Sequence, residues 1–143
     1  LENKEGYKNS YQYNIIRDLA VKGIGIHHAG LIPVFKEIIE MLFSKNLIKV
    51  LFATETFAVG LNMPTKTVIF TDIYKFDNRG KRRLMTHEFI QMSGRAGRRG
   101  IDTKGFVIIT PQLFSEDISS KELENLIFGS SQKIQSKFMF RPV

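Results

Sequence analysis

Residues 24–53 read IGIHHAGLIPVFKEIIEMLFSKNLIKVLFA, and this stretch decides the fold. It begins with a short apolar strand, Ile24 to His27, and ends with a second one, Ile48 to Ala53. Between them, from Leu31 to Lys45, apolar residues recur at intervals of three and four, which places them on one face of a helix. Pro33 falls in the first turn of that helix, where its missing N–H costs no hydrogen bond. Two strands joined by a helix predict a parallel βαβ unit.

Further strands and helices continue this alternation on both sides of the unit. We expect strands at Thr67–Thr71 and Phe106–Thr110, the second buried on both faces of a sheet. The expected helices have clear end signals and run from Tyr11 to Lys22 before Gly23, from His87 to about Arg95 after a Thr86 cap, and from a Ser119–Glu122 capping box to Gly129. The pattern predicts an α/β fold whose mostly parallel sheet is covered by helices on both faces. Ligands of such sheets bind in the loops after the strands, which here follow Ile26, Ala53, Phe70 and Ile109.

The composition limits the class of protein. A chain of 143 residues that is 43% hydrophobic suits one domain with its own apolar core and excludes a disordered tail. No signal peptide is recognisable and no apolar run approaches the ~20 residues of a membrane span, so we expect no membrane association. The absence of cysteine excludes a disulfide framework and a thiolate metal site. The chain starts at Leu1 in a polar stretch, so we expect it to be excised from a longer protein.

Positive charge is concentrated in one part of the sequence. The whole chain carries +7, and the stretch from Lys75 to Gly100 alone holds eight basic and two acidic residues, a net +6. Such a concentration usually indicates phosphate nearby, either in a nucleic acid backbone or in a nucleotide. For Arg79 to Arg83, a solvated loop kept for solubility is an equally good interpretation.

Two arginines near the end of this stretch are the strongest candidates for chemistry. They lie in Gln91-Met-Ser-Gly-Arg-Ala-Gly-Arg-Arg-Gly100, where Arg95 and Arg98 stand among small neighbours. On one helical turn they would point the same way, and two converging guanidinium groups indicate a multiply anionic partner such as phosphate. The alternative is a helix end whose arginines offset the helix dipole. The phosphate interpretation requires both arginines to face the edge where the ligand loops gather, and to be free of internal partners.

This stretch resembles motif VI of superfamily-two helicases, in the form that DExH-box RNA helicases use. Ala53-Thr-Glu-Thr-Phe-Ala-Val-Gly-Leu-Asn-Met-Pro64 resembles motif V, and Gly25-Ile-His-His-Ala-Gly-Leu31 resembles the segment between motifs IV and V. Within the family the similarity is greatest to the exosome-cofactor (SKI/MTR) group. The resemblance implies the second RecA-like domain of such an enzyme, a three-layer sandwich that takes part in ATP-driven 3′-to-5′ RNA unwinding for RNA processing and decay. It also implies the RNA exosome and its adaptor proteins as partners, and Ser93 favours the nuclear member of the group over its cytoplasmic relative.

The same resemblance implies roles for individual residues on the nucleotide side. Arg98 would be the arginine finger, Arg95 a second phosphate contact, and Gln91 a neighbour of the γ-phosphate and its attacking water. Gly60 and Asn62 of motif V would also face the nucleotide. ATP and its Mg²⁺ would be held mainly by the first RecA-like domain, so hydrolysis would depend on closure of the cleft between the two domains.

RNA contacts are expected elsewhere in the same motifs. Three polar residues follow a strand end, where hydroxyl and N–H groups can hold an RNA phosphate: Thr54, Glu55 and Thr56. In the family, the segment that contains His28 and Gly30 lies along the RNA backbone. The amides of Gly30 and Leu31 would open the next helix, and free amides at a helix start bind phosphate.

Some features of motor enzymes are not expected in this chain. His27 and His28 point to opposite faces of a strand and cannot share an ion, so we expect no metal site. The sequence contains neither G-x-x-x-x-G-K-[ST] nor Asp-Glu-x-His, so we expect the chain alone neither to hydrolyse ATP nor to unwind a duplex. We expect the RecA-like domain over residues 24–129. A lead-in and first helix at 1–23 would lack the motif IV strand, and 130–143 would be a linker toward a further domain.

Two other functions remain open. A non-catalytic basic module would bind RNA through Lys75 to Arg83, with a hairpin around Asn78-Arg79-Gly80. Motif VI favours the motor over this module, because paired arginines among small residues suit a compact phosphate better than an extended strand. A DNA-directed helicase of the same superfamily would make the same phosphate contacts, because such contacts do not distinguish the sugars.

Overall fold

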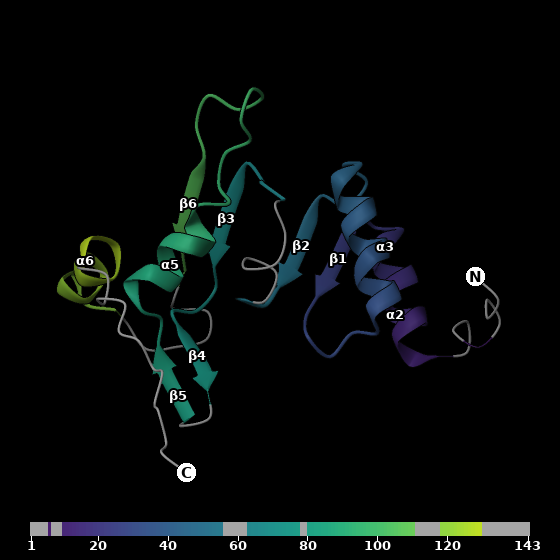
Figure 1. Ribbon diagram of the computed structural model, residues 1–143, viewed down its shortest axis with the longest axis horizontal. Coiled ribbons are helices and arrows are strands. Elements are labelled where there is room, and N and C mark those ends of the chain that lie inside the picture. The colour runs from purple at the N-terminus through teal and green to yellow at the C-terminus, as the bar shows by residue number, and fades with distance from the viewer. Residues whose placement is uncertain (1–5, 7–9, 56–62, 78–79, 111–117, 130–143) are drawn as a thin grey trace, which may run out of the picture. The chain divides into compact units, whose positions relative to one another are not determined.

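The computed structural model describes residues 6, 10–55, 63–77, 80–110 and 118–129. The chain forms two compact units, Leu1–Met63 and Pro64–Val143, and each contains a two-stranded parallel sheet (Figure 1). Parallel strands joined through helices confirm the α/β class. Within the described ranges, no helix is long and apolar enough to cross a membrane.

The first unit contains the βαβ arrangement predicted from residues 24–53. Its elements are, in chain order, α2 (Tyr11–Ala20), β1 (Ile24–His27), α3 (Pro33–Ser44) and β2 (Val50–Ala53). The strands pair in parallel, with Ile24 opposite Val50 and His27 opposite Ala53. Both helices contact β1. The core of this unit consists of buried apolar side chains: Ile16, Leu31, Phe35, Ile39 and Ile48.

Short-range signals set the ends of α2. The Ser10 hydroxyl accepts a hydrogen bond from the Tyr13 amide at 3.1 Å and so caps the first turn. Gly23 follows the helix with φ +74°, a left-handed conformation that glycine adopts without a steric penalty. The predicted stop at Gly23 and the predicted start of β1 at Ile24 are therefore confirmed.

The second unit combines a parallel pair of strands with a hairpin and two helices. Strands β3 (Thr67–Phe70) and β6 (Phe106–Ile109) pair in parallel, and β4 (Tyr74–Asp77) and β5 (Gly80–Arg83) pair antiparallel. The antiparallel pairing confirms the hairpin expected in this stretch. Helices α5 (Thr86–Ser93) and α6 (Ser120–Phe128) contact each other (Figure 1). The core of this unit is built from five buried side chains: Phe70, Ile73, Leu84, Phe89 and Leu126.

The caps of the two helices in this unit differ in how well the sequence predicted them. The box before α6 is confirmed, because the Ser119 hydroxyl accepts from the Glu122 amide and the Glu122 carboxylate accepts from the Ser119 amide. The Thr86 cap is wrong. Thr86 is the first residue of α5, and its hydroxyl donates to the Asn125 carbonyl oxygen of α6. The cap is made instead by the Glu88 carboxylate, which accepts a hydrogen bond from the Met85 amide at 2.8 Å.

Helix α3 runs from Pro33 to Ser44, close to the predicted bounds, and Pro33 lies in its first turn as expected. One further expectation is wrong. Strand β6 is not buried on both faces within the described part of the chain, since Phe106, Val107 and Ile108 are each 41% to 49% exposed. A run of apolar residues predicts a strand but not how many layers cover it.

Candidate functional site

The segment with the two candidate arginines leaves α5 before it reaches them. Helix α5 ends at Ser93, and the Gly94 amide closes it by donating to the Ile90 carbonyl oxygen at 2.8 Å. Gly97 then has φ +92°, so the backbone turns between Arg95 and Arg98. The prediction that the two arginines share one helical turn is therefore wrong.

The backbone of this arginine segment, residues 95–98, is clamped between the residues that precede β3 and β6. The Thr65 amide donates to the Arg95 carbonyl oxygen at 2.9 Å, and the Gly97 amide donates to the Thr65 carbonyl oxygen at 2.6 Å. On the other side lies Gly105, where an added Cβ would stand 2.5 Å from the Ala96 carbonyl carbon. Only glycine fits there, and the segment is held by backbone groups on both sides.

The clamp places the arginine segment at the N-terminal edge of this unit's parallel sheet (Figure 1). We expected ligand groups at the opposite edge, in the loops after the strands, and that expectation is wrong for Arg95 and Arg98. The reason is topological. A crossover that links the end of β3 to the start of the parallel strand β6 must return to the N-terminal edge, and α5 belongs to that crossover.

Arg98 is held by a carboxylate four residues further along the chain. Its Nε donates to Asp102 Oδ2 at 2.7 Å and its Nη2 donates to Oδ1 at 2.9 Å. The Arg98 amide also donates to Oδ2, at 3.1 Å. These hydrogen bonds lower the pKa of Asp102 to about 2 and raise the pKa of Arg98 above its ordinary value. The requirement that Arg98 be free of internal partners is therefore not met.

Sequence reasoning missed Asp102, although the spacing of four residues from Arg98 was a usable signal. Two of the other candidates on the nucleotide side, Gln91 and Arg95, lie nearby in the chain. Gln91 is exposed on the last turn of α5, and Arg95 is half-buried. Gly60 and Asn62 lie outside the described residues.

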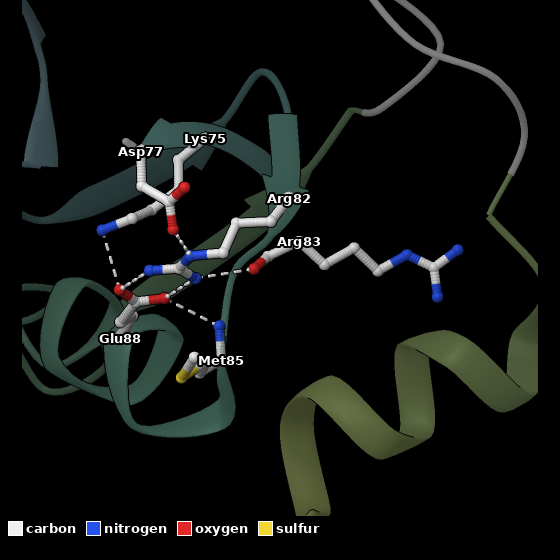
Figure 2. Close-up of polar contacts among 6 residues, drawn as sticks. All are labelled: Lys75, Asp77, Arg82, Arg83, Met85 and Glu88. Carbon is white, nitrogen blue, oxygen red and sulfur yellow. Dashed lines mark hydrogen bonds and ion pairs between the residues drawn. The ribbon is translucent and has the colours of Figure 1, made fainter. Parts of the chain in front are cut away.

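Much of the positive charge in the hairpin is matched by carboxylates, as Figure 2 shows. Glu88 of α5 accepts from Lys75 at 2.8 Å and from both Nη atoms of Arg82, each at 2.8 Å. Arg82 Nε donates to Asp77 at 2.7 Å. The hydrogen bonds from Arg82, with those from Lys75 and the Met85 amide, hold the pKa of Glu88 well below its ordinary value.

The next two cations of the hairpin are also engaged within the fold. Arg83 donates to the Tyr74 hydroxyl at 3.1 Å and forms an ion pair with Glu122 of α6. The Lys81 ammonium lies 4.7 Å from the centre of the Tyr74 ring. Three of the hairpin's described cations, Lys75, Arg82 and Arg83, are thus paired with carboxylates of the fold, which makes the hairpin less suited to the basic-module alternative.

The candidate RNA-binding residues of the first unit gather at one edge of its sheet. His28 follows β1, and Thr54 and Glu55 follow β2, so parallel pairing brings them to the same C-terminal edge. The Thr54 amide donates to the His27 carbonyl oxygen at 3.1 Å, which joins the two strand ends. The structure thus assembles the predicted set, except for Thr56, which lies outside the described residues.

The turn after β1 uses the amides that we expected to be open to phosphate. The Gly30 amide donates to His28 Nδ1 at 3.1 Å, and the Leu31 amide donates to the His28 carbonyl oxygen at 3.2 Å. Gln12 of α2 fixes the same turn, because its side chain donates to the Gly30 carbonyl oxygen and accepts from the Ile32 amide. The prediction of free amides is wrong, and no local pattern in the sequence links Gln12 to a turn so far along the chain.

The two adjacent histidines point to different environments. His27 is 5% exposed, and its Nε2 lies 2.8 Å from Glu40 Oε1 of α3, whereas His28 belongs to the turn. The contact between His27 and Glu40 links β1 to α3. Among the described residues, no three His, Asp or Glu side chains are grouped as a metal site requires.

Comparison with known proteins gives the chain a family. Residues 7–100 match the model described as the helicase conserved C-terminal domain. The chain is 52% identical over 122 residues to the antiviral helicase SKI2 of Saccharomyces cerevisiae, a match that covers 85% of the chain and 9% of that protein. It is 50% identical over 127 residues to the exosome RNA helicase MTR4 of Homo sapiens, covering 89% of the chain and 12% of that protein. The ATP-dependent RNA helicase mtr4 of Schizosaccharomyces pombe is 49% identical over 127 residues, with 89% and 11% covered.

The chain therefore spans about a tenth of the length of these relatives. The arrangement expected of the motor, two arginines without internal partners that face the ligand loops, is not found for Arg98, and the family assignment rests on the sequence match alone. By its family match and its similarity to these enzymes, the chain belongs to the helicase conserved C-terminal domain family, in the SKI2 and MTR4 group of DExH-box RNA helicases.

Proposed function

We propose that the chain serves as the second RecA-like motor domain of an ATP-dependent RNA helicase that unwinds RNA in the 3′-to-5′ direction. The observation that carries this proposal is the match of residues 7–100 to the helicase conserved C-terminal domain. The arginine segment supplies the group that the proposal uses. Thr65 bonds to the backbone just before Arg98, Gly105 packs against that backbone, and Asp102 holds the Arg98 side chain. A rigidly placed guanidinium is the group needed to stabilise the charge that develops on a transferring phosphoryl group.

This chain and the first RecA-like domain supply different groups for ATP hydrolysis. Arg98 acts as the arginine finger, Arg95 contacts the same phosphates, and Gln91 lies beside the attacking water. Gly60 and Asn62 line the nucleotide side of motif V. ATP and Mg²⁺ are held mainly by the first RecA-like domain, so hydrolysis requires the two domains to close on each other.

RNA is bound at the C-terminal edge of the β1–β2 sheet. Support comes from the grouping of His28, Gly30, Thr54 and Glu55 at this edge, and Thr56 completes the set. The amides of Gly30, Leu31 and Thr54 are already bonded within the fold, so we expect side-chain groups to make the contacts to phosphate.

The setting of this motor is proposed from the relatives. The domain occupies residues 24–129 as a three-layer RecA-like sandwich, with a lead-in at 1–23 and a linker at 130–143. The helicase acts in RNA processing and decay with the RNA exosome and its adaptors. Support comes from the human relative, which is named an exosome RNA helicase, and Ser93 favours a nuclear location over a cytoplasmic one.

Replacing Arg98 by Lys in the full-length protein tests the motor function. Lysine keeps the charge but loses the fork that binds two phosphate oxygens. We expect RNA-stimulated ATP hydrolysis to fall by about 10³-fold or more while RNA affinity changes little. Arg99→Lys, the same substitution at the exposed neighbouring residue, serves as the control.

The two alternatives give different results. If the chain were a non-catalytic basic module, substitutions of the cations between Lys75 and Arg83 would lower RNA affinity. Arg98→Lys would then leave the rate of ATP hydrolysis unchanged. A DNA-directed helicase would hydrolyse ATP faster with single-stranded DNA than with RNA of the same sequence. Hydrolysis that is unchanged in Arg98→Lys would refute the proposed motor function.

A further inference from the structure

We propose that Asp102 is a positioning residue, which orients the Arg98 guanidinium so that its outer edge can contact the nucleotide. This inference rests on the proposed function of Arg98. It concerns a residue outside the motif, in the loop that leads to β6.

Arg98 and Asp102 form a tight turn in which each residue donates hydrogen bonds to the other. Asp102 accepts from the Arg98 amide and from Nε and Nη2 of its side chain. In return the Asp102 amide donates to the Arg98 carbonyl oxygen at 2.9 Å. Gly100 sits between them with φ +74°, which lets the chain turn this tightly. The side chain of Arg98 is thereby folded against its own backbone and fixed in direction.

The hydrogen-bond pattern decides which edge of the guanidinium is available, and burial shows that Arg98 is the more exposed partner. The Asp102 side chain is 7% exposed, whereas the Arg98 side chain is 34% exposed. A guanidinium has five N–H donors, and Asp102 occupies one on Nε and one on Nη2. The donors that it leaves lie on the Nη side, where a phosphate can accept two N–H groups at once.

A short carboxylate suits this position for a chemical reason. Asparagine has the same shape, but one of its two terminal groups is an N–H donor, which would face an N–H donor of Arg98. Glutamate keeps the charge and both acceptors on a longer side chain. Asp102→Asn should therefore release the guanidinium, and Asp102→Glu should restore part of its orientation.

The test compares four variants of the full-length protein in RNA-stimulated ATP hydrolysis: Asp102→Asn, Asp102→Glu, Arg98→Ala and the double variant Arg98→Ala with Asp102→Asn. We expect Asp102→Asn to lower kcat by between about 10- and 100-fold with a smaller change in KM for ATP, since misplacing a catalytic group by about 1 Å has effects of this size. Asp102→Glu should recover part of the loss. In the Arg98→Ala background, Asp102→Asn should have less than about a two-fold effect, because residues that act as a unit are not additive.

The control removes an arginine–aspartate pair on an exposed surface. Asp18→Asn breaks the Arg17–Asp18 pair of α2, whose side chains are 55% and 62% exposed, and should leave kcat unchanged.

Three outcomes overturn the inference. They are an unchanged kcat in Asp102→Asn, an equal loss with and without Arg98, or a failure of Asp102→Glu to exceed Asp102→Asn. Failure of the proposed function looks different, because Arg98→Ala would then hydrolyse ATP as fast as the unaltered protein.

Discussion

One carboxylate, that of Glu88, binds two cations and one backbone amide from the hairpin and the start of α5 (Figure 2). Its side chain is 16% exposed, so these bonds are partly shielded from water. The charge count in the sequence predicted the cations but assigned them to phosphate. Their actual partner is visible only when α5 packs against the hairpin.

Replacing Glu88 by Gln should destabilise the protein by about 1.5–3 kcal/mol, because hydrogen bonds to charged groups contribute this much. The variant keeps the size of the side chain but leaves Lys75 without this charge partner and Arg82 with Asp77 alone. Chemical denaturation at pH 7 measures the difference. Glu124→Gln, an exposed change of the same kind on α6, should alter the free energy of unfolding by less than about 0.5 kcal/mol.

The same carboxylate predicts a dependence of stability on pH. The folded state lowers the pKa of Glu88, so the stabilisation is complete above its unfolded pKa of about 4.3 and is lost as the pH falls below that value. We expect the thermal midpoint to fall between pH 5 and pH 3, and to fall less in Glu88→Gln. Equal slopes in both proteins would mean that Glu88 titrates normally in the folded state.

At the scale of elements, periodicity predicted α3 well because the helix has one buried stripe. Phe35 and Ile39 lie on that stripe, and Ile38 lies beside it. The turn before α3 could not be predicted, because the contact that fixes it comes from Gln12, which no local pattern reveals. Helix α5 ends at Ser93, close to the expected Arg95, and the backbone after it bonds to Thr65.

Adjacent isoleucines of α3 provide a matched test of this packing. Ile39 is 1% exposed and Ile38 is 38% exposed. Ile39→Ala should cost about 2–5 kcal/mol of the free energy of unfolding, since it removes buried methyl groups and leaves a cavity. Ile38→Ala should cost less than about 1 kcal/mol, and similar losses at both positions would contradict the burial assigned to α3.

At the scale of the whole chain, the order of the motifs along the sequence predicted the family, and residues 7–100 match its model. Positioning residues were less predictable. Gln12 and Glu88 act through contacts with residues that no local pattern links to them, whereas the spacing of Asp102 from Arg98 was a usable signal. Sequence patterns name the groups that do chemistry more readily than the groups that orient them.

The chain on its own should not hydrolyse ATP, because the motifs that bind the phosphates and Mg²⁺ do not occur in its sequence. Phosphate release by the purified chain with saturating RNA should not exceed that of the Arg98→Ala variant. A clear excess over that variant would show that hydrolysis does not need the first RecA-like domain.

The clamp on the arginine segment has a mechanical consequence. Thr65 bonds to the main chain of that segment and Gly105 packs directly against it, so the segment is linked to the starts of β3 and β6. A displacement of the segment by a bound nucleotide should therefore shift both strands of this parallel sheet and not only a loop.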